Sequence, residues 1–343
     1  MTIPRFDLSD DEVHQIEALL SDLASRFETV EDQDFLMDLG VYAQELPRRL
    51  RRALYRFRLE EPASAVLLLG GFPVDEKRIG ATPLHWNHRV DPSPTLREEL
   101  MILLGSSLLG EPFGWGTQQD GFLVHDILPI PGREKEQLGS GCEELLEWHT
   151  EDAFHPFCGD YLVLMCMRNP LGIPTTFASL ENVVLSDEER TLLFEPLYPI
   201  VPDESHLVKF QSNGHAADES QGKAYEEMER MSSETVRIPV LSGAPESPYV
   251  RIDRFTMEDP EDERALAALE GLAQQIEANI VDLVLRPGEI CFIDNYKGVH
   301  GRKPFKARYD GQDRWLKRVN VARDLRRSRH VRTAAVDRVI YGG

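Results

Sequence analysis

Apolar residues near the start of the chain recur at helical spacing. Ser9 and Glu12 form the pattern of a capping box, in which each side chain bonds to the backbone of the other where a helix begins. The apolar positions that follow are Val13, Ile16, Leu20, Leu23 and Phe27. Because these residues share one face of a helix, the pattern predicts a first helix that buries that face.

A second helical pattern covers residues 34–58 and contains Pro47. Proline lacks the backbone N–H and clashes with the preceding turn, so we expect this helix to break or kink there. The arginines at 48, 49, 51 and 52 are typical of a solvated or ion-paired helix face rather than of a binding patch. Further helices are predicted over 96–109, 186–194 and 261–283.

Short apolar runs bounded by turn residues predict strands. They lie at 65–69, 122–127, 161–167, 175–179, 249–252, 290–293 and 316–322. Helices come first and most of the short strands come later, which favours a mixed α/β fold with mainly antiparallel strands and helices packed outside them. No linker rich in Pro, Gly and Ser divides the chain, so we expect residues 1–343 to form a single domain.

The segment 212–234 differs from its surroundings, because it is polar and rich in Glu, Ser and Gly. This composition predicts a mobile loop or a short surface helix. Two interpretations remain open: an ordinary exposed insertion, or a lid that closes over a site.

The balance of charge excludes some partners. The chain has 59 acidic and 38 basic residues, a formal charge of -21 and a pI near 4.9, which disfavours nucleic acid and anionic membranes. The four cysteines show no CxxC pairing, so we expect reduced thiols. There is no basic-then-apolar leader and no apolar run of membrane-spanning length. We therefore expect a cytoplasmic protein with neither a nucleic-acid nor a membrane partner; its oligomeric state stays open.

One short stretch carries residues that could bind a metal. Side chains alternate in an extended segment, so His149 and Glu151 point the same way. With His300 they would supply two imidazoles and one carboxylate, a set that suits non-haem iron(II) and leaves coordination positions open. Arg314 and Arg318 follow His300 by 14 and 18 residues and could pair with carboxylates, which indicates a dicarboxylate co-substrate. Taken alone, however, a His-x-Glu triplet is more often structural.

Beyond these residues, several longer stretches match a known family. They are 114–121, 149–154, 168–170, 293–302 and 308–325. In these stretches the chain resembles the clavaminate-synthase-like Fe(II)/2-oxoglutarate oxygenases, in the branch that hydroxylates free arginine, asparagine or enduracididine. The resemblance implies a double-stranded β-helix, or jelly roll, with the metal inside its mouth. It further implies a β-helix core over about 115–325, a helical N-terminal part over about 8–110, and a lid over about 205–235 that closes over the substrate.

The resemblance also implies a role for each matching residue. The iron ligands would be His149, Glu151 and His300; Arg314 and Thr175 would hold 2-oxoglutarate; Arg318 would bind the α-carboxylate of the substrate, and Gln118, with Glu151, its α-amino group; Asp203 and Asp253 would face its cationic end. Simpler interpretations remain open for some of them. Thr175 could be a plain strand residue, Gln118 could make a helix-end hydrogen bond, and the two aspartates could be exposed loop acids.

The implied reaction consumes 2-oxoglutarate and dioxygen, releases succinate and carbon dioxide, and hydroxylates an unactivated carbon of a free polar or basic L-amino acid. C3 is favoured and C4 is the alternative. Related halogenases have a small residue where this chain has Glu151, so we expect hydroxylation rather than chlorination.

The substrate is less well defined than the reaction, and arginine, enduracididine, lysine and asparagine are all candidates. The arginine hydroxylases have a third acidic residue where this chain has Phe255. A site that has Asp253 but lacks this neighbour could accept a side-chain amide, an ammonium group, or a flat cyclic guanidine stacked on Phe255. The residues around Asp253 and the segment 338–341 look closer to the enduracididine hydroxylase.

Three other functions are compatible with parts of the sequence. The substrate could be an aminoacyl group on a carrier protein, although Arg318 favours a free carboxylate. The chain could instead be a noncatalytic metal-binding β-sandwich, or a zinc hydrolase with the same three ligands. Neither of these gives Arg314 and Arg318 a role, and a noncatalytic protein would form no succinate.

Overall fold

The computed structural model describes residues 3–207 and 218–342. Its α-helices are α1 (Asp10–Arg26), α2 (Gln33–Tyr42), α3 (Arg48–Glu60), α4 (Glu76–Ile79), α5 (Leu96–Ser107), α6 (Asp187–Phe194), α7 (Glu219–Ser233) and α8 (Glu263–Ala278). Helix α1 begins at the predicted capping box, where the Glu12 N–H donates to Ser9 Oγ and the Ser9 N–H donates to the Glu12 carboxylate. The helices predicted over 96–109 and 186–194 are confirmed as α5 and α6.

The second predicted helix is broken near Pro47, as expected. Helix α2 ends at Tyr42, the short 3-10 helix η1 (Ala43–Glu45) follows, and α3 begins directly after the proline. The arginine run faces outward in part, and its Arg49 pairs with Glu12 of α1. This ion pair helps to hold the first and third helices together.

Three elements were predicted with wrong boundaries, and one of them is the strand expected over 249–252, which is found at 247–250. The helix expected over 261–283 ends at Ala278, and the residues after it form strand β12 (Val281–Leu283), which pairs with Thr175–Phe177. The strand expected over 122–127 is reduced to β4 (His125–Ile127). The residues before β4 pack into the helical core instead, and the Leu123 N–H donates to Glu31.

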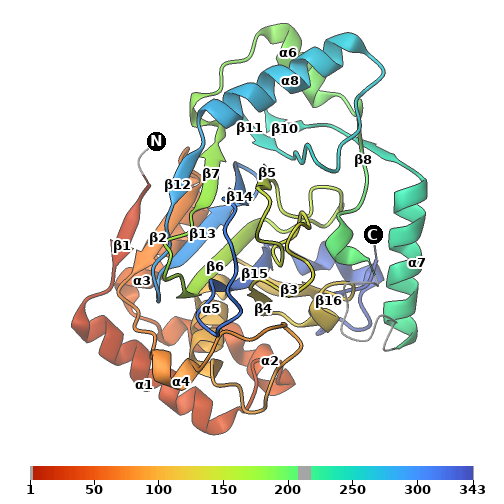
Figure 1. Cartoon of the computed structure of the whole chain (residues 1–343). Coiled ribbons are helices and arrows are strands. Elements are labelled where there is room, and N and C mark those ends of the chain that lie inside the picture. The colour runs from red at the N-terminus through yellow and green to blue at the C-terminus, as the bar shows by residue number, and fades with distance from the viewer. Residues whose placement is uncertain (1–2, 208–217, 343) are drawn as a thin grey trace.

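Two antiparallel sheets form the centre of the molecule (Figure 1). The strands of the larger sheet are β1 (Arg5–Asp7), β2 (Val66–Gly70), β13 (Ile290–Asp294), β6 (Tyr161–Arg168), β15 (Trp315–Ala322), β3 (Glu111–Trp115) and β16 (Val339–Ile340), with β4 beside β15. The smaller sheet has the order β12, β7 (Thr175–Ser179), β14 (Gly298–Arg302) and β5 (Leu146–His149). Pairing is antiparallel except at the β1–β2 and β3–β16 contacts. Two further antiparallel sheets have two strands each: β8 (Tyr198–Ile200) pairs with β9 (Val236–Ile238), and β10 (Leu241–Ala244) pairs with β11 (Ser247–Val250).

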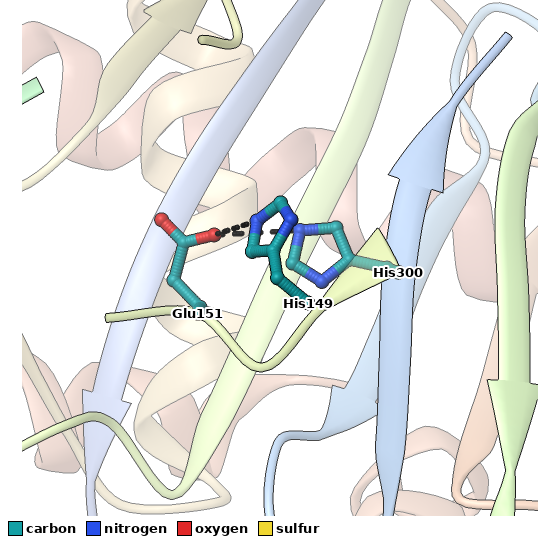
Figure 2. A group of neighbouring side chains, drawn as sticks. All are labelled: His149, Glu151 and His300. Atoms are coloured by element: carbon teal, nitrogen blue, oxygen red, sulfur yellow. Dashed lines mark ion pairs between the residues drawn. The ribbon is translucent and has the colours of Figure 1, made fainter. Parts of the chain in front are cut away.

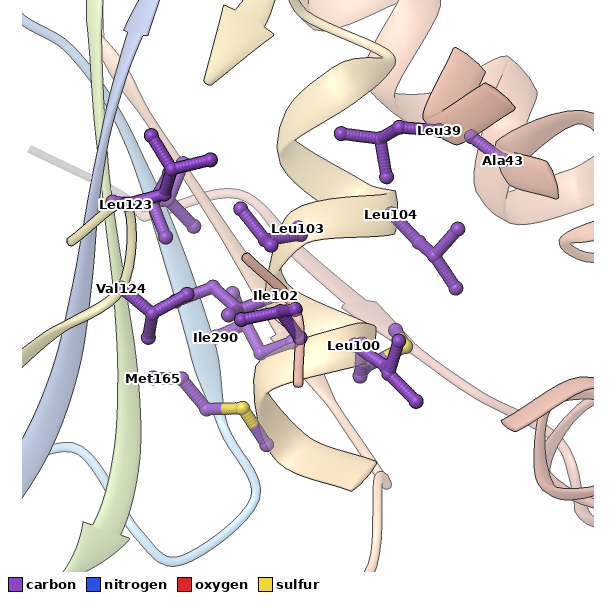
Figure 3. Close-up of a cluster of buried hydrophobic side chains, with 14 of the residues drawn as sticks. Leu39, Ala43, Leu100, Ile102, Leu103, Leu104, Leu123, Val124, Met165 and Ile290 are labelled. Atoms are coloured by element: carbon purple, nitrogen blue, oxygen red, sulfur yellow. The ribbon is translucent and has the colours of Figure 1, made fainter. Parts of the chain in front are cut away.

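Alternation along the strands gives the larger sheet two buried faces. One face meets the smaller sheet, and residues of both sheets, such as Leu164 and Phe177, share one apolar cluster. The other face is covered by α5, which lies between the sheet and the N-terminal helices (Figure 3).

The polar segment predicted as a loop or a short helix contains the 15-residue helix α7. Residues 208–217 of the expected lid lie outside the described residues. Helix α7 buries an apolar face and is fixed to the core by Gln221, whose Nε2 donates to the Gly116 carbonyl 2.9 Å away. Among the described residues, no helix combines the length and the apolar character that a membrane crossing requires.

Candidate active site

His149, Glu151 and His300 converge at the mouth between the two sheets (Figure 2). His149 ends β5 and is the direct cross-strand partner of His300 in β14. The Oε2 atom of Glu151 lies 3.6 Å from His149 Nε2 and 3.3 Å from His300 Nε2. Each residue offers one ligand atom, and these atoms lie within 4.8 Å of one another.

Neighbouring groups orient this cluster. His149 Nδ1 lies 2.8 Å from the Glu147 carbonyl, to which it donates, so the lone pair of Nε2 is left for a metal. The side chain of Asn295 holds the backbone of Glu151 on both sides: Oδ1 accepts the Glu151 N–H at 2.9 Å and Nδ2 donates to the Glu151 carbonyl at 3.1 Å. These contacts fix the direction in which the carboxylate projects.

The electrostatics of the cluster fit a divalent cation. Burial alone would raise the pKa of Glu151, but Arg318 and the two histidines hold it well below its ordinary value. Burial lowers the pKa of His300; it would also lower that of His149, but Glu151 and Asp253 raise it to about 9. A metal ion in place of the His149 proton would bind two imidazole nitrogens and a carboxylate oxygen, the donor set that suits Fe(II).

Arg314 and Thr175 meet deeper in the same pocket. Arg314 directly precedes β15 and its Nη2 donates to Thr175 Oγ1 at 3.0 Å, so Thr175 is more than a plain strand residue. Arg314 is buried and forms no ion pair with a residue that the structure describes. Burial and the neighbouring Arg302 lower its pKa to about 10. A carboxylate ligand would neutralise this guanidinium.

Arg318 projects from β15 toward the histidine cluster. Its Nη1 pairs with Glu151 Oε1, and its Nη2 donates to Gln118 Oε1 and His125 Nδ1, both at 2.8 Å. Gln118 makes no helix-end hydrogen bond with its side chain; its Nε2 donates to Ser205 Oγ at 2.6 Å. Gln118 therefore supports Arg318, and its contact with an α-amino group stays a prediction.

Two carboxylates, those of Asp203 and Asp253, line the same pocket. Asp253 is held beside His149 by an isolated β-bridge, and Asp203 precedes the 3-10 helix η4 (Glu204–His206). Burial and the nearby Asp253 raise the pKa of Asp203, against the hydrogen bonds from Ser205 that lower it. Neither aspartate forms an ion pair within the described part of the chain. Asp253 is buried and Asp203 is half-buried, so neither is an exposed loop acid.

The structure gathers the predicted residues into one place. All of them except Gln118 line one pocket of about 100 Å³, and Gln118 lines the adjoining one together with Arg318. Phe255 lies at the pocket rim and is 54 % exposed. The side chains that sequence reasoning missed are Asn295, Arg302, His125 and Ser205. Asn295 and Arg302 lie inside matching stretches, but no local pattern indicates what they contact.

The sequence and the fold both match known proteins. Residues 130–320 match the family described as taurine catabolism dioxygenase TauD, TfdA family. The chain is 45 % identical to an enduracididine beta-hydroxylase of Streptomyces hygroscopicus, over 97 % of this chain and 98 % of that protein. It is 43 % identical to an L-ornithine/L-arginine 3-hydroxylase of Catenulispora acidiphila, over 94 % of this chain and 95 % of that protein.

Among solved structures, the non-heme iron oxygenase OrfP in complex with Fe, succinate and (3S)-hydroxy-L-Arg superposes with a TM-score of 0.93. The two proteins are 43 % identical, and the match covers 98 % of this chain and 99 % of OrfP. The predicted mixed α/β fold with a double-stranded β-helix core is thereby confirmed. The chain belongs to the TauD, TfdA family and is an Fe(II)/2-oxoglutarate-dependent oxygenase of the amino-acid hydroxylase group.

Proposed function

We propose that this oxygenase hydroxylates C3 of a free cationic L-amino acid of the arginine and enduracididine class. The observation that carries the proposal is the placement of Asp203 and Asp253 in the pocket of the histidine cluster, where neither pairs with a lysine or an arginine among the described residues. Buried carboxylates are costly unless they are paired, so the pocket is suited to a positively charged side chain. The relatives that hydroxylate arginine or enduracididine support this choice.

The proposed roles follow from the placement of each group. His149, Glu151 and His300 would hold iron, and Arg314 with Thr175 would hold the distal carboxylate of 2-oxoglutarate. Arg318, supported by Gln118, would take the α-carboxylate of the substrate. With Asp203 and Asp253 holding the other end of the substrate, the carbons between the two ends would lie across the histidine cluster.

Iron and 2-oxoglutarate, when bound, supply the oxidising power for attack on an unactivated C–H bond. The contribution of the chain is to fix which C–H bond lies nearest the metal. Two anchoring points at the ends of a flexible substrate restrict it to a few geometries, and a small misplacement would change the carbon that reacts. C3 is closer than C4 to the carboxylate that Arg318 would hold, and C4 is the second candidate.

The proposal is tested by turnover. Iron-loaded protein is incubated with 2-oxoglutarate and, one at a time, arginine, enduracididine, ornithine, lysine and asparagine. We expect arginine or enduracididine to stimulate succinate formation most, with a product heavier by one oxygen and a hydroxyl that NMR places on C3. If no free amino acid stimulates succinate formation, the proposed function is wrong.

Phe255 is the residue that we propose sets the choice between these two substrates. It lies at the rim, two positions after Asp253, where its ring could stack on a flat cyclic guanidinium. Phe255→Asp adds a carboxylate, and a charge-assisted hydrogen bond contributes about 1.5–3 kcal/mol, so we expect kcat/KM for arginine to rise roughly tenfold or more. Phe255→Leu, the control, should weaken enduracididine turnover with no gain for arginine. An unchanged arginine turnover in Phe255→Asp would contradict this assignment.

We also propose that α7 is part of the lid, because Gln221 fixes it next to the segment that carries Gln118. A helix in this place would help to exclude water once the substrate is bound.

All four cysteines are buried and unpaired, which supports the cytoplasm as the compartment.

A further inference from the structure

Two buried guanidinium groups lie at one end of the pocket, although the chain as a whole is strongly acidic. Arg302 is 3 % exposed and Arg314 is 6 % exposed, and both line the pocket. Neither forms an ion pair with any residue in the described part of the chain. The proposed function uses Arg314 and leaves Arg302 without a role.

Strand geometry places Arg302 close to the other groups of this end of the pocket. It follows His300 by two residues in β14, so both side chains lie on the inner face of the smaller sheet. Its direct cross-strand partner in β7 is Thr175, the residue that accepts a hydrogen bond from Arg314. Each guanidinium is near enough to the other for Arg302 to lower the pKa of Arg314.

The hydrogen bonds of Arg302 satisfy its donors only in part. Its Nη1 donates to the carbonyls of Cys142 and Lys303 at 3.2 and 3.3 Å, and its Nη2 donates to the Glu144 carbonyl at 3.4 Å. Its Nε is buried without a partner, as is that of Arg314. The bonds to Cys142 and Glu144 hold the segment that leads into β5, which ends at His149. Carbonyl groups orient the guanidinium but do not neutralise its charge.

Two uncompensated positive charges at one end of a small pocket favour a ligand that brings a carboxylate to that end. We propose that Arg302 is a second cationic residue of the 2-oxoglutarate subsite, which acts with Arg314 to make the site select a dianionic 2-oxo acid over a monoanionic one. This inference rests on the proposed function. Arg302 also positions the subsite, because it ties β14 to the segment before β5.

The test measures binding rather than turnover. Iron-loaded protein is titrated without oxygen with 2-oxoglutarate and with 2-oxobutanoate, which has the same metal-chelating end but no distal carboxylate, and binding is followed by the visible absorption band of the iron–2-oxo-acid complex. Arg302→Gln should weaken 2-oxoglutarate binding at least tenfold and leave 2-oxobutanoate binding within twofold. Arg302→Lys, which keeps the charge, should retain an intermediate preference for 2-oxoglutarate.

The control is Lys303→Gln, which removes a neighbouring positive charge that is exposed and paired with Asp282. It should leave both affinities unchanged. If Arg302→Gln or Arg302→Lys weakens the binding of both ligands equally, the role of Arg302 is only structural. If binding does not change, Arg302 has no part in the subsite. Either result overturns the inference. Should wild-type protein fail to prefer 2-oxoglutarate over 2-oxobutanoate, the proposed function itself would fail.

Discussion

Asn295 shows how a single side chain can fix a metal ligand. Its amide bonds to the N–H and the carbonyl of Glu151 and to the carbonyl of Gly159, and all of these groups are buried. Asn295→Ala leaves them without partners, so we expect a loss of unfolding free energy of about 1–3 kcal/mol or more. Because the direction of the Glu151 carboxylate is no longer fixed, iron affinity should fall by about 10–100-fold. Thermal unfolding and iron titration measure the two effects separately.

Asn169 provides a matched control. Its amide also makes three hydrogen bonds, two with Ile173 and one with Leu285, and it contacts none of the three predicted iron ligands. Asn169→Ala should therefore lower stability by a similar amount and leave iron affinity unchanged. Equal losses of iron affinity in the two variants would show that Asn295 acts only through stability.

At the scale of single residues, the sequence indicates which residues belong to the site better than it indicates what each of them contacts. His149, Glu151, His300 and Arg314 could be singled out from residue type and spacing, but Glu151 lies in the turn after β5 rather than in an extended segment. The partner of Asn295 could not be predicted, because it lies 144 residues away along the chain and is a backbone group. Backbone N–H and carbonyl groups occur in almost every residue, so the sequence does not show which of them bonds to a given side chain.

Helix α5 is fixed to the central sheet by a buried ion pair. Lys317 of β15 lies 2.9 Å from Glu99 of α5 and 2.7 Å from Asp126 of β4. Burial alone would raise the pKa of Glu99, but the attraction of Lys317 and the hydrogen bonds from Thr95 and Lys317 lower it to about 2. The contact therefore depends on an ionised Glu99.

The sign of the pH dependence follows from this lowered pKa. A carboxylate whose pKa is lower in the folded protein stabilises the fold above its unfolded pKa of about 4.5, and this contribution is lost as the pH falls toward 2. The contribution is about 3 kcal/mol. Urea unfolding at a series of pH values should show the loss in wild-type protein and a flatter profile in Glu99→Gln. Glu111→Gln, which removes a partly exposed partner of Arg338, should keep the wild-type profile.

Element boundaries were predicted where the signal is local and missed where it is not. The capping box of α1 and the break at Pro47 are properties of adjacent residues. Strand β12 was taken for the end of a helix, because its pairing with β7 is decided by residues far away in sequence. Strands β5 and β14 were missed as strands because each carries polar residues of the site in place of an apolar run.

On the scale of the whole molecule, the helical N-terminal part and the β-helix core share one apolar cluster. It contains Leu20 of α1 and Leu103 of α5 together with Met165 and Phe292 of the larger sheet. We therefore propose that the chain folds as one domain. Calorimetry should show a single transition with equal calorimetric and van't Hoff enthalpies. Two separate transitions would contradict this proposal.

Ligand binding should act on that same transition. A ligand that binds only the folded state raises its stability by about 2.7 kcal/mol at a hundred times its Kd. Fe(II) with 2-oxoglutarate should therefore raise Tm in wild-type protein and much less in His300→Ala.

The arrangement of the two sheets could be expected only from the resemblance, because strand periodicity predicts strands but not the order in which they pair.

The central claim is that His149, Glu151 and His300 bind one iron ion beside the carboxylate site of Arg314. A crystal structure of the protein loaded with Fe(II) and 2-oxoglutarate, with anomalous data at the iron edge, tests it most directly. We predict one anomalous peak within bonding distance of both histidine Nε2 atoms and of the Glu151 carboxylate, with the distal carboxylate of 2-oxoglutarate on Arg314. A peak elsewhere, or His300 turned away from the metal, would contradict the claim.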